Sequence, residues 1–231
     1  MASAPSIAWT SERTLLVEWG ERPSVEASLR VGAFLTALGR SPPPGLTDAT
    51  PAYTSVVLSF DALRVDERRA EHAVRAACAP AAPEPVATGI VVEIPFCAEG
   101  DDVAPDLAFV AARAGLAAGD VIDLFASRMF TCAFVGFTPG FPYLIGLPAP
   151  LRAPRLDTPR PRVAPGSVAI AGDQTGVYPA ATPGGWRIIG RTHARVFDAS
   201  RERAALVQAG DHVRFLPITR PEFERAAGGA P

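Results

Sequence analysis

The side chains best suited to contact a ligand are concentrated in a segment of glycine, proline and aromatic residues, GFTPGFPYLIGLP, at positions 136–148. Such a segment cannot form a helix, and it is unfavourable for a central strand. We expect a rigid loop whose rings wall a groove, because proline limits the entropy lost on binding and glycine lets a ligand approach the backbone. The residues expected in this groove are Phe137, Pro139, Gly140, Phe141 and Tyr143. The same composition also suits the corner of a barrel whose aromatic side chains only fill the core.

A cluster of arginines follows the aromatic segment. Arg152, Arg155, Arg160 and Arg162 stand among prolines, and Asp157 is the acidic residue between them. Guanidinium groups bind carboxylates and phosphates through paired hydrogen bonds, and prolines favour a stiff extended chain that would hold them in place. Arg160 and Arg162 are therefore candidates for binding an anionic ligand. The alternative is a solvated basic loop.

Uncharged hydrogen-bonding groups come next, in the segment GDQTGVYPAATPGGWRIIGRT at positions 172–192. Gln174, Thr175 and Tyr178 offer groups that would orient an amide. A Pro-Gly-Gly turn places Trp186 at the start of a strand, where it is either a platform for a ligand or a core residue. His193 has no neighbouring carboxylate or nucleophile in the sequence, so no triad is visible and we assign no catalytic residue.

Composition excludes several classes of site. The 231 residues carry 22 basic side chains, all of them arginine, because the sequence contains no lysine. This rules out a P-loop lysine, a Schiff-base lysine and a lysine that carries biotin. A net charge of −2 argues against nucleic acid or an anionic membrane as a partner. The three cysteines and three histidines are widely separated, which predicts reduced thiols and no metal site. Reduced thiols and the lack of a leader pattern predict a cytoplasmic protein.

The elements that would position these residues divide at a proline-rich stretch, residues 80–85. Before it, apolar periodicity predicts strands at 13–19, 46–50 and 53–60, with helices that begin at Pro23-Ser24 and at Asp66. Their order resembles an incomplete ferredoxin-like layer. We therefore expect an α+β fold whose N-terminal α+β domain spans residues 1–84.

After the boundary the pattern changes. A strand is expected at 89–96, a helix at 106–114, and a short helix capped by Asp120 with Asp123 in its first turn. From Phe130 onward, short apolar runs divided by glycine and proline predict a compact β-barrel or sandwich. These runs are FTCAFVGF, GSVAIAG, TGVYP, WRIIGRT, ARVF and HVRFLPI. We assign this domain to residues 85–220 and expect residues 221–231 to form a frayed tail.

Three consecutive segments resemble the signature of a known family: VGFTPGFPYLIGLP, PRPRVAPGSVAIAGDQTGVYP and TPGGWRIIGRT. They look like the family of the 5-oxoprolinase B subunit, which also includes KipI, an inhibitor of a sporulation kinase, and the protein called allophanate hydrolase subunit 1. The signature covers about 136–192, and a looser similarity extends over nearly the whole chain. The resemblance implies a carboxyltransferase-type domain with a C-terminal cyclophilin-like β-barrel, which agrees with the boundary placed at the prolines.

The resemblance also implies a heteromeric complex. Family members work with a companion chain that corresponds to the C subunit of 5-oxoprolinase and with a third chain that corresponds to its A subunit. Together they open 5-oxoproline to glutamate at the expense of ATP. The implied function is one subunit of an ATP-dependent lactam hydrolase, inactive alone. ATP with magnesium is expected in the complex, and no cofactor is expected on this chain by itself. The alternative is a KipI-like inhibitor that binds a sensor histidine kinase.

Some positions depart from the family pattern. Phe125 and Phe130 stand where the family often has a histidine and a tyrosine. If that histidine takes part in the reaction, this chain has lost or changed the activity; if it is structural, phenylalanine is a tolerable apolar replacement. Ile145 stands where glycine is common, which would narrow the groove, and Ala164 stands where proline is common.

Overall fold

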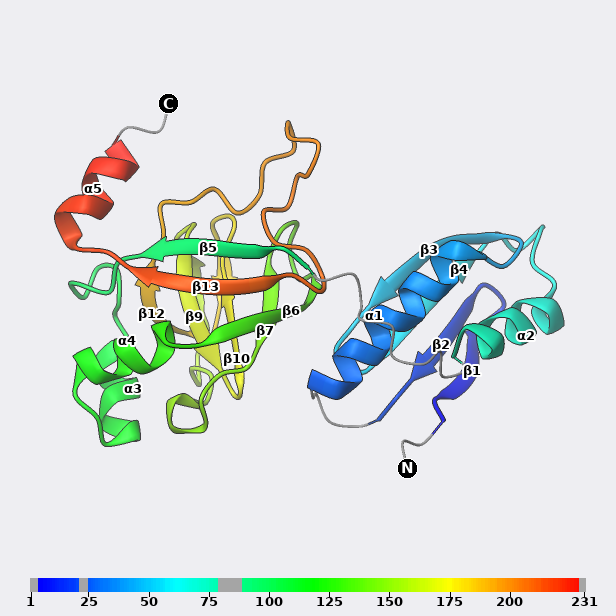
Figure 1. Cartoon of the computed structure of the whole chain (residues 1–231), viewed down its shortest axis with the longest axis horizontal. Helices are drawn as coiled ribbons and strands as arrows, with labels where there is room; N and C mark the ends of the chain where they lie inside the picture. Colours follow the sequence, from blue (N-terminus) through cyan, green and yellow to red (C-terminus); the bar gives the residue numbers. More distant parts are fainter. Residues whose placement is uncertain (1–3, 21–24, 79–88, 229–231) are drawn as a thin grey trace. The chain divides into compact units, whose positions relative to one another are not determined.

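The computed structural model describes residues 4–20, 25–78 and 89–228. The chain divides into two compact units, residues 1–88 and 89–231, and each is described by itself (Figure 1). The predicted boundary between residues 84 and 85 and the predicted helix start at Pro23-Ser24 lie outside the described residues.

The N-terminal unit is a sheet covered by helices. Its elements are β1 (Ser6–Ser11), β2 (Thr14–Glu18), α1 (Val25–Arg40), β3 (Leu46–Pro51), β4 (Ser55–Phe60) and α2 (Glu67–Cys78). The strands lie in the order β1-β2-β4-β3, and every neighbouring pair is antiparallel. Strand β1 was not expected, because its short and mostly exposed sequence becomes a strand only by pairing with β2 in a hairpin. The description of this unit as ferredoxin-like stays a prediction.

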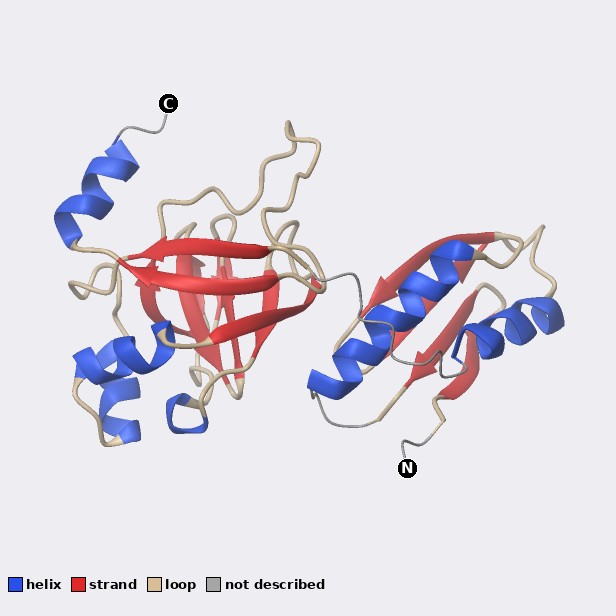
Figure 2. Ribbon diagram, in the orientation of Figure 1, coloured by secondary structure: helices blue, strands red, loops and turns tan. Residues whose placement is uncertain are grey.

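The core of the N-terminal unit lies between one face of the sheet and the two helices. Alternate strand residues such as Leu15 and Leu58 are wholly buried, and they belong to one apolar cluster with Phe34 of α1 and Val74 of α2. Figure 2 shows both helices against the sheet. The apolar periodicity of the sequence therefore identified the buried faces correctly.

The C-terminal unit carries the segments that the sequence singled out. Its elements are β5 (Val91–Phe96), α3 (Leu107–Ala114), α4 (Ala118–Ala126), β6 (Met129–Val135), β7 (Pro142–Ile145), the short 3-10 helix η1 (Ala149–Leu151), β8 (Arg160–Val163), β9 (Ser167–Ala171), β10 (Gln174–Val177), β11 (Thr182–Gly184), β12 (Arg187–Arg191), β13 (His212–Pro217) and α5 (Arg220–Gly228). The seven-stranded sheet has the order β12-β9-β10-β7-β6-β13-β5, and β8 pairs with β11 in a separate two-stranded ribbon.

The two ends of the seven-stranded sheet meet, so the sheet is a nearly closed barrel. Cys97, which directly follows the edge strand β5, forms an antiparallel bridge with Arg191 of the opposite edge strand β12. The two residues exchange backbone N–H···O hydrogen bonds of 2.8 Å in both directions. This bridge satisfies backbone groups that an open sheet would leave unpaired at its edges. The expected mixed α+β fold with a β-barrel is therefore confirmed.

The barrel core is aromatic. Phe96, Phe125, Phe130 and Phe215 are wholly or almost wholly buried, and their ring centroids lie 4.9–5.7 Å apart in successive pairs. Phe125 comes from α4 and the other rings come from strands, so this cluster fastens the helix to the barrel. Phe125 and Phe130 are therefore packing residues in this chain.

Four local expectations were wrong. Residues 142–145 form strand β7 and not a loop, which is possible because Pro142 is the first residue of the strand. ARVF contributes only an isolated bridge, Phe197 to Ala205. Helix α4 begins after Ala117, so Asp120 lies in its first turn and does not cap it.

The fourth correction concerns the C-terminus. Residues 220–228 form helix α5, where a frayed tail was expected. Phe223 is buried against Cys97 and Val103, and Arg220 forms a bidentate ion pair with Asp102 at 2.7 and 2.9 Å. These contacts come from residues more than a hundred positions away, which the local sequence of the tail could not reveal.

Candidate functional site

The loop between β6 and β7 has an unusual backbone. The Thr138 N–H donates to the Gly136 carbonyl at 2.7 Å, which makes a three-residue turn centred on Phe137. Phe137 has φ of 66°, and it is the one non-glycine residue with a positive φ in the parts of the chain that the structure describes. Its side chain is nevertheless 62% exposed. A bulky residue held in this conformation on the surface is strained without gaining burial, which points to a role in binding.

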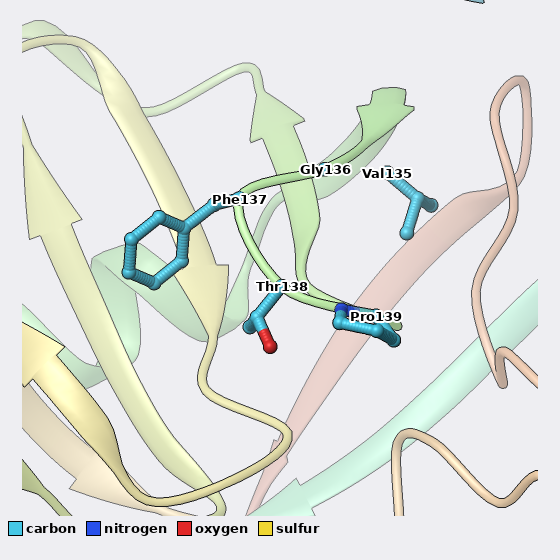
Figure 3. A pocket seen from close by; sticks show the side chains of 5 residues that line it. All are labelled: Val135, Gly136, Phe137, Thr138 and Pro139. Carbon is cyan, nitrogen blue, oxygen red and sulfur yellow. The ribbon is translucent and has the colours of Figure 1, made fainter.

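A shallow open hollow lies along this loop. Its volume is about 290 Å³, and it is lined by Val135, Gly136, Phe137, Thr138 and Pro139. Figure 3 shows the Phe137 ring extending to one side of the loop, away from Val135 and Pro139. Gly140 has φ of +83°, and a Cβ atom there would collide with Phe197. Two of the predicted groove residues, Phe137 and Pro139, therefore line the hollow, and Gly140 lets the loop close against Phe197.

The predicted aromatic residues come together in one group, which we call the aromatic cluster. Its members are Phe137, Phe141, Tyr143, Tyr178 and Trp186. Phe141 is central, with its ring centroid 5.6 Å from Phe137, 4.9 Å from Tyr143, 5.1 Å from Tyr178 and 5.4 Å from Trp186. All of these pairs are edge-to-face, the arrangement that aromatic quadrupoles favour. Phe141, Tyr178 and Trp186 are at most 5% exposed, so both interpretations of the segment hold in part: an aromatic core with an exposed edge at Phe137.

The aromatic cluster lies on the face of β9 and β10 opposite the main barrel core. Val168, Ile170 and Val177 belong to the large core, whereas Ala169 and Ala171 belong to the cluster that contains Phe141. Alternate residues of a strand point to opposite faces, which accounts for this division. Gly176 pairs with Ala169, and a Cβ atom there would stand 2.8 Å from Phe141. The small residues of β9 and β10 therefore make the space that the rings occupy.

Burial keeps the two tyrosines of the cluster neutral. It raises the pKa of Tyr143 and of Tyr178 above the ordinary value of 10. Both hydroxyls consequently stay protonated at neutral pH and can donate hydrogen bonds. The Tyr178 hydroxyl forms a hydrogen bond with the backbone of Trp186. It also packs so closely on Gly184 that no side chain fits at position 184. The Tyr178 hydroxyl is therefore part of the scaffold.

Arg160 is committed to an internal ion pair. Its guanidinium contacts both carboxylate oxygens of Asp106, at 3.0 and 2.9 Å, and its other terminal nitrogen lies 3.5 Å from the Trp186 carbonyl. Asp106 is 5% exposed and also accepts the Ile188 N–H at 2.7 Å. Arg187 completes the group, 3.6 Å from Asp106 and stacked 3.8 Å from the centroid of the Phe109 ring. The guanidinium of Arg160 is thus held by an internal carboxylate beside the aromatic cluster, and its predicted role in binding an anionic ligand stays a prediction.

Arg155 was not singled out by the sequence, and the structure brings it to the aromatic cluster. Its guanidinium carbon lies 5.9 Å from the centroid of the Trp186 ring. The charge of Arg155 lowers the pKa of Tyr143 and Tyr178 against the larger effect of burial. The sequence signal was the run of four arginines, but nothing local distinguished Arg155 from the other three.

The remaining predicted site residues differ in their accessibility. Arg162 is exposed on β8. Gln174 is half-buried, and its register partner Ala171 belongs to the cluster side of the sheet. Thr175 is fully buried, and its hydroxyl donates to the Ala169 carbonyl at 2.9 Å. Thr175 therefore stabilises the β9–β10 pair and is not available to orient a ligand.

The structure offers no grouping for a metal within the described residues: no set of three or more His, Cys, Asp or Glu side chains is close enough to hold one. We derive no step through magnesium on this chain. None of the described helices combines the length and the apolar character that crossing a membrane requires.

The fold and the site define a two-unit α+β protein whose barrel carries an aromatic cluster flanked by arginines. The family described as carboxyltransferase domain, subdomain C and D, matches residues 5–207, and the chain belongs to this family. The B subunit of 5-oxoprolinase from Bacillus subtilis (strain 168) is 33% identical over 222 residues, which cover 92% of each chain. The B subunit of 5-oxoprolinase from Escherichia coli O157:H7 is 50% identical over 126 residues, 54% of this chain and 57% of that one.

Solved structures contain the same fold within longer chains. TTHA0988 superposes with a TM-score of 0.78 at 40% identity, covering 89% of this chain but 40% of TTHA0988. The urea carboxylase of Kluyveromyces lactis superposes with a TM-score of 0.72 over 96% of this chain and 22% of its own length. At 19% identity the latter shows the fold alone. In both proteins the part that matches this chain makes up less than half of the polypeptide.

Proposed function

We propose that this chain is one subunit of an ATP-dependent 5-oxoprolinase-type complex, in which it helps to bind the lactam substrate or its phosphorylated intermediate. The observation that carries the proposal is the accessible edge of the aromatic cluster with Arg155 beside it: the exposed Phe137 ring, the neutral hydroxyl of the half-buried Tyr143 and one cation suit a small ring that bears an amide and a carboxylate. The relatives that are named as the B subunit of 5-oxoprolinase support this class of reaction.

The chemistry explains why a positioning subunit is useful. A lactam carbonyl is a poor electrophile because the ring nitrogen donates electron density to it. Transfer of the terminal phosphoryl group of ATP to the lactam oxygen forms an O–P bond, breaks the phosphoanhydride bond and releases ADP. One water then adds to the ring carbon, the C–N bond breaks, and a second water displaces phosphate to leave glutamate. The residues of this chain would hold the ring in place for these steps.

We propose that the site is completed by two companion chains, which correspond to the C and the A subunits of 5-oxoprolinase. The hollow at residues 135–139 is shallow and open, and Phe137 is exposed, so one wall of an enclosed site is missing in this chain alone. The occurrence of this fold within the longer chains of TTHA0988 and urea carboxylase supports an association with further domains. We place ATP binding in the complex and assign no nucleotide site to this chain.

The test is ADP release after addition of 5-oxoproline to this chain alone, to the companion chains alone and to the mixture. The proposal requires turnover in the complete mixture only. If the mixture releases no ADP although its chains are shown to be folded and associated, 5-oxoproline is rejected as the substrate.

The exposed and strained Phe137 supports a second candidate function, a KipI-like inhibitor that binds a sensor histidine kinase. Exposed aromatic residues are frequent anchors of protein interfaces. Inhibition of autophosphorylation of a histidine kinase by the purified chain, lost in Phe137→Ala, would favour this function over the enzyme complex.

A further inference from the structure

The sequence offered four arginines as anion-binding groups, and the structure separates them by what their guanidinium groups already bind. Arg160 is paired with Asp106, which also lies 3.6 Å from Arg187. Arg155 is exposed, and it makes no hydrogen bond or ion pair with any of the described residues. A cation beside an aromatic ring and without an anionic partner remains available to a ligand.

The backbone around Arg155 is held on both sides. The Ala153 carbonyl accepts the Gly172 N–H at 2.7 Å, the Pro154 carbonyl accepts the Arg187 Nε–H at 3.2 Å, and the Leu156 N–H donates to the Gly185 carbonyl at 2.7 Å. These bonds connect the segment to the turn after β9, to β12 and to the turn that leads to Trp186. Because its neighbours are anchored, the Arg155 side chain starts from a defined position next to Trp186, which reduces the entropy that binding would cost.

From these observations we infer that Arg155, held over the Trp186 ring, and the half-buried Tyr143 form a subsite for the carboxylate of a small lactam acid. This inference rests on the proposed function for the identity of its ligand, a lactam that carries a carboxylate. The ring centroids of Tyr143 and Trp186 lie 5.7 Å apart. The Arg155 guanidinium lies over the Trp186 ring, and its charge lowers the pKa of Tyr143. The guanidinium binds the carboxylate, and the Tyr143 ring contacts the planar amide of the lactam.

The charge of the subsite favours a carboxylate over a phosphate. The guanidinium of Arg155 matches the single negative charge of a carboxylate, whereas a phosphate group near neutral pH carries nearly two. Arg160 and Arg187 share the single charge of Asp106, so these three groups keep a net charge of +1, but both guanidinium groups are held by that carboxylate. Arg155 by itself would therefore neutralise a bound phosphate incompletely.

The experiment is an NMR titration of the whole chain that follows the indole N–H signal of Trp186, which is identified by its loss in Trp186→Phe. The ligands are 5-oxoproline, 2-pyrrolidinone, which is the same lactam without the carboxylate, and inorganic phosphate. The wild-type chain is expected to bind 5-oxoproline at least tenfold more tightly than 2-pyrrolidinone. Arg155→Gln is expected to abolish this difference, and Arg155→Lys to restore part of it.

Arg152→Gln is the matched control, because Arg152 is an exposed arginine of the same segment, whereas Arg155 is the one whose guanidinium lies over the Trp186 ring. It is expected to keep the full preference for the carboxylate. Three results would each overturn the inference: no binding of 5-oxoproline to the wild-type chain, an unchanged preference in Arg155→Gln, or phosphate binding as tight as that of 5-oxoproline. The ADP-release assay on the complex tests the proposed function separately. A negative result in that assay therefore does not contradict the subsite, and a negative NMR titration does not contradict the proposed function.

Discussion

The carboxylate of Asp106 and the guanidinium of Arg160 meet at 2.9 Å beside the aromatic cluster, in a pair that the chain brings together from positions 54 residues apart. Asp106 precedes helix α3, and Arg160 begins strand β8. The same carboxylate accepts the backbone N–H of Ile188 in β12. One buried carboxylate thus connects a helix, the two-stranded ribbon and the edge of the barrel.

Removal of this carboxylate should destabilise the C-terminal unit. Asp106→Ala leaves two arginines without their shared partner and the Ile188 N–H without an acceptor, and we expect a loss of about 3–5 kcal/mol in the free energy of unfolding. Urea denaturation measures this loss. Asp123→Ala, which removes an exposed carboxylate of α4, should change stability by less than about 0.5 kcal/mol. Equal effects of the two variants would contradict a structural role for Asp106.

The left-handed backbone at Phe137 predicts a difference between two substitutions. Phe137→Gly and Phe137→Ala both remove the exposed ring, but only glycine relieves the strain of a φ of 66°. We expect Phe137→Gly to be more stable than Phe137→Ala by about 1 kcal/mol. Thermal unfolding of both variants gives the difference.

The same pair of variants tests whether the ring serves binding. If the ring contacts a substrate or partner, both variants should reduce turnover of the assembled complex at least about tenfold, the effect of losing roughly 1.4 kcal/mol of interaction. If both variants keep full activity, the Phe137 ring does not contact the substrate or partner, whatever the stabilities of the two variants.

Two glycines with different surroundings give a further test of the loop. In Gly140→Ala the new Cβ would collide with Phe197, and the φ of +83° is unfavourable for alanine, so we expect a loss of about 2 kcal/mol or more. In Gly119→Ala, within helix α4, no atom lies within 4 Å of the new Cβ, and stability should rise by up to about 1 kcal/mol. Chemical denaturation should therefore show a decrease in the free energy of unfolding for Gly140→Ala and an increase for Gly119→Ala.

Asp198 should contribute to the acid dependence of stability. Hydrogen bonds from Ser200, followed by one from Arg195, lower the pKa of Asp198 to about 2 in the folded chain. Because the folded pKa lies below the unfolded one, the stabilisation is fully present above about pH 4 and is lost as the pH falls toward 2. Asp198→Asn should therefore lower the melting temperature at pH 5 but have little effect near pH 2.

The control for this pH dependence is Asp157→Asn, because the Asp157 carboxylate forms no ion pair or hydrogen bond with the described residues. Its melting temperature should follow that of the wild-type chain from pH 5 to pH 2. An Asp198→Asn curve parallel to the wild-type curve over this range would show that Asp198 does not stabilise the fold.

Much of the candidate site was predictable, and the reasons for the misses are specific. Phe137, Phe141, Tyr143, Tyr178 and Trp186 were named from composition and do form one cluster. The pairing of Arg160 with Asp106 could not be predicted, because Asp106 lies far away in the sequence. The burial of Thr175 could not be predicted either, because the face to which a strand residue points depends on the register of its partners.

The sequence by itself determined which chemistry is open to this protein and where its buried faces lie. The absence of lysine, the aromatic and arginine-rich segments and the apolar periodicities are local properties, and the family signature is a linear pattern. Tertiary structure alone decided how the barrel closes, through Cys97 and Arg191, and which arginine of the cluster is paired with an internal carboxylate. Both depend on contacts between residues distant in the chain, whose geometry arises only when the strands are paired and the core is packed.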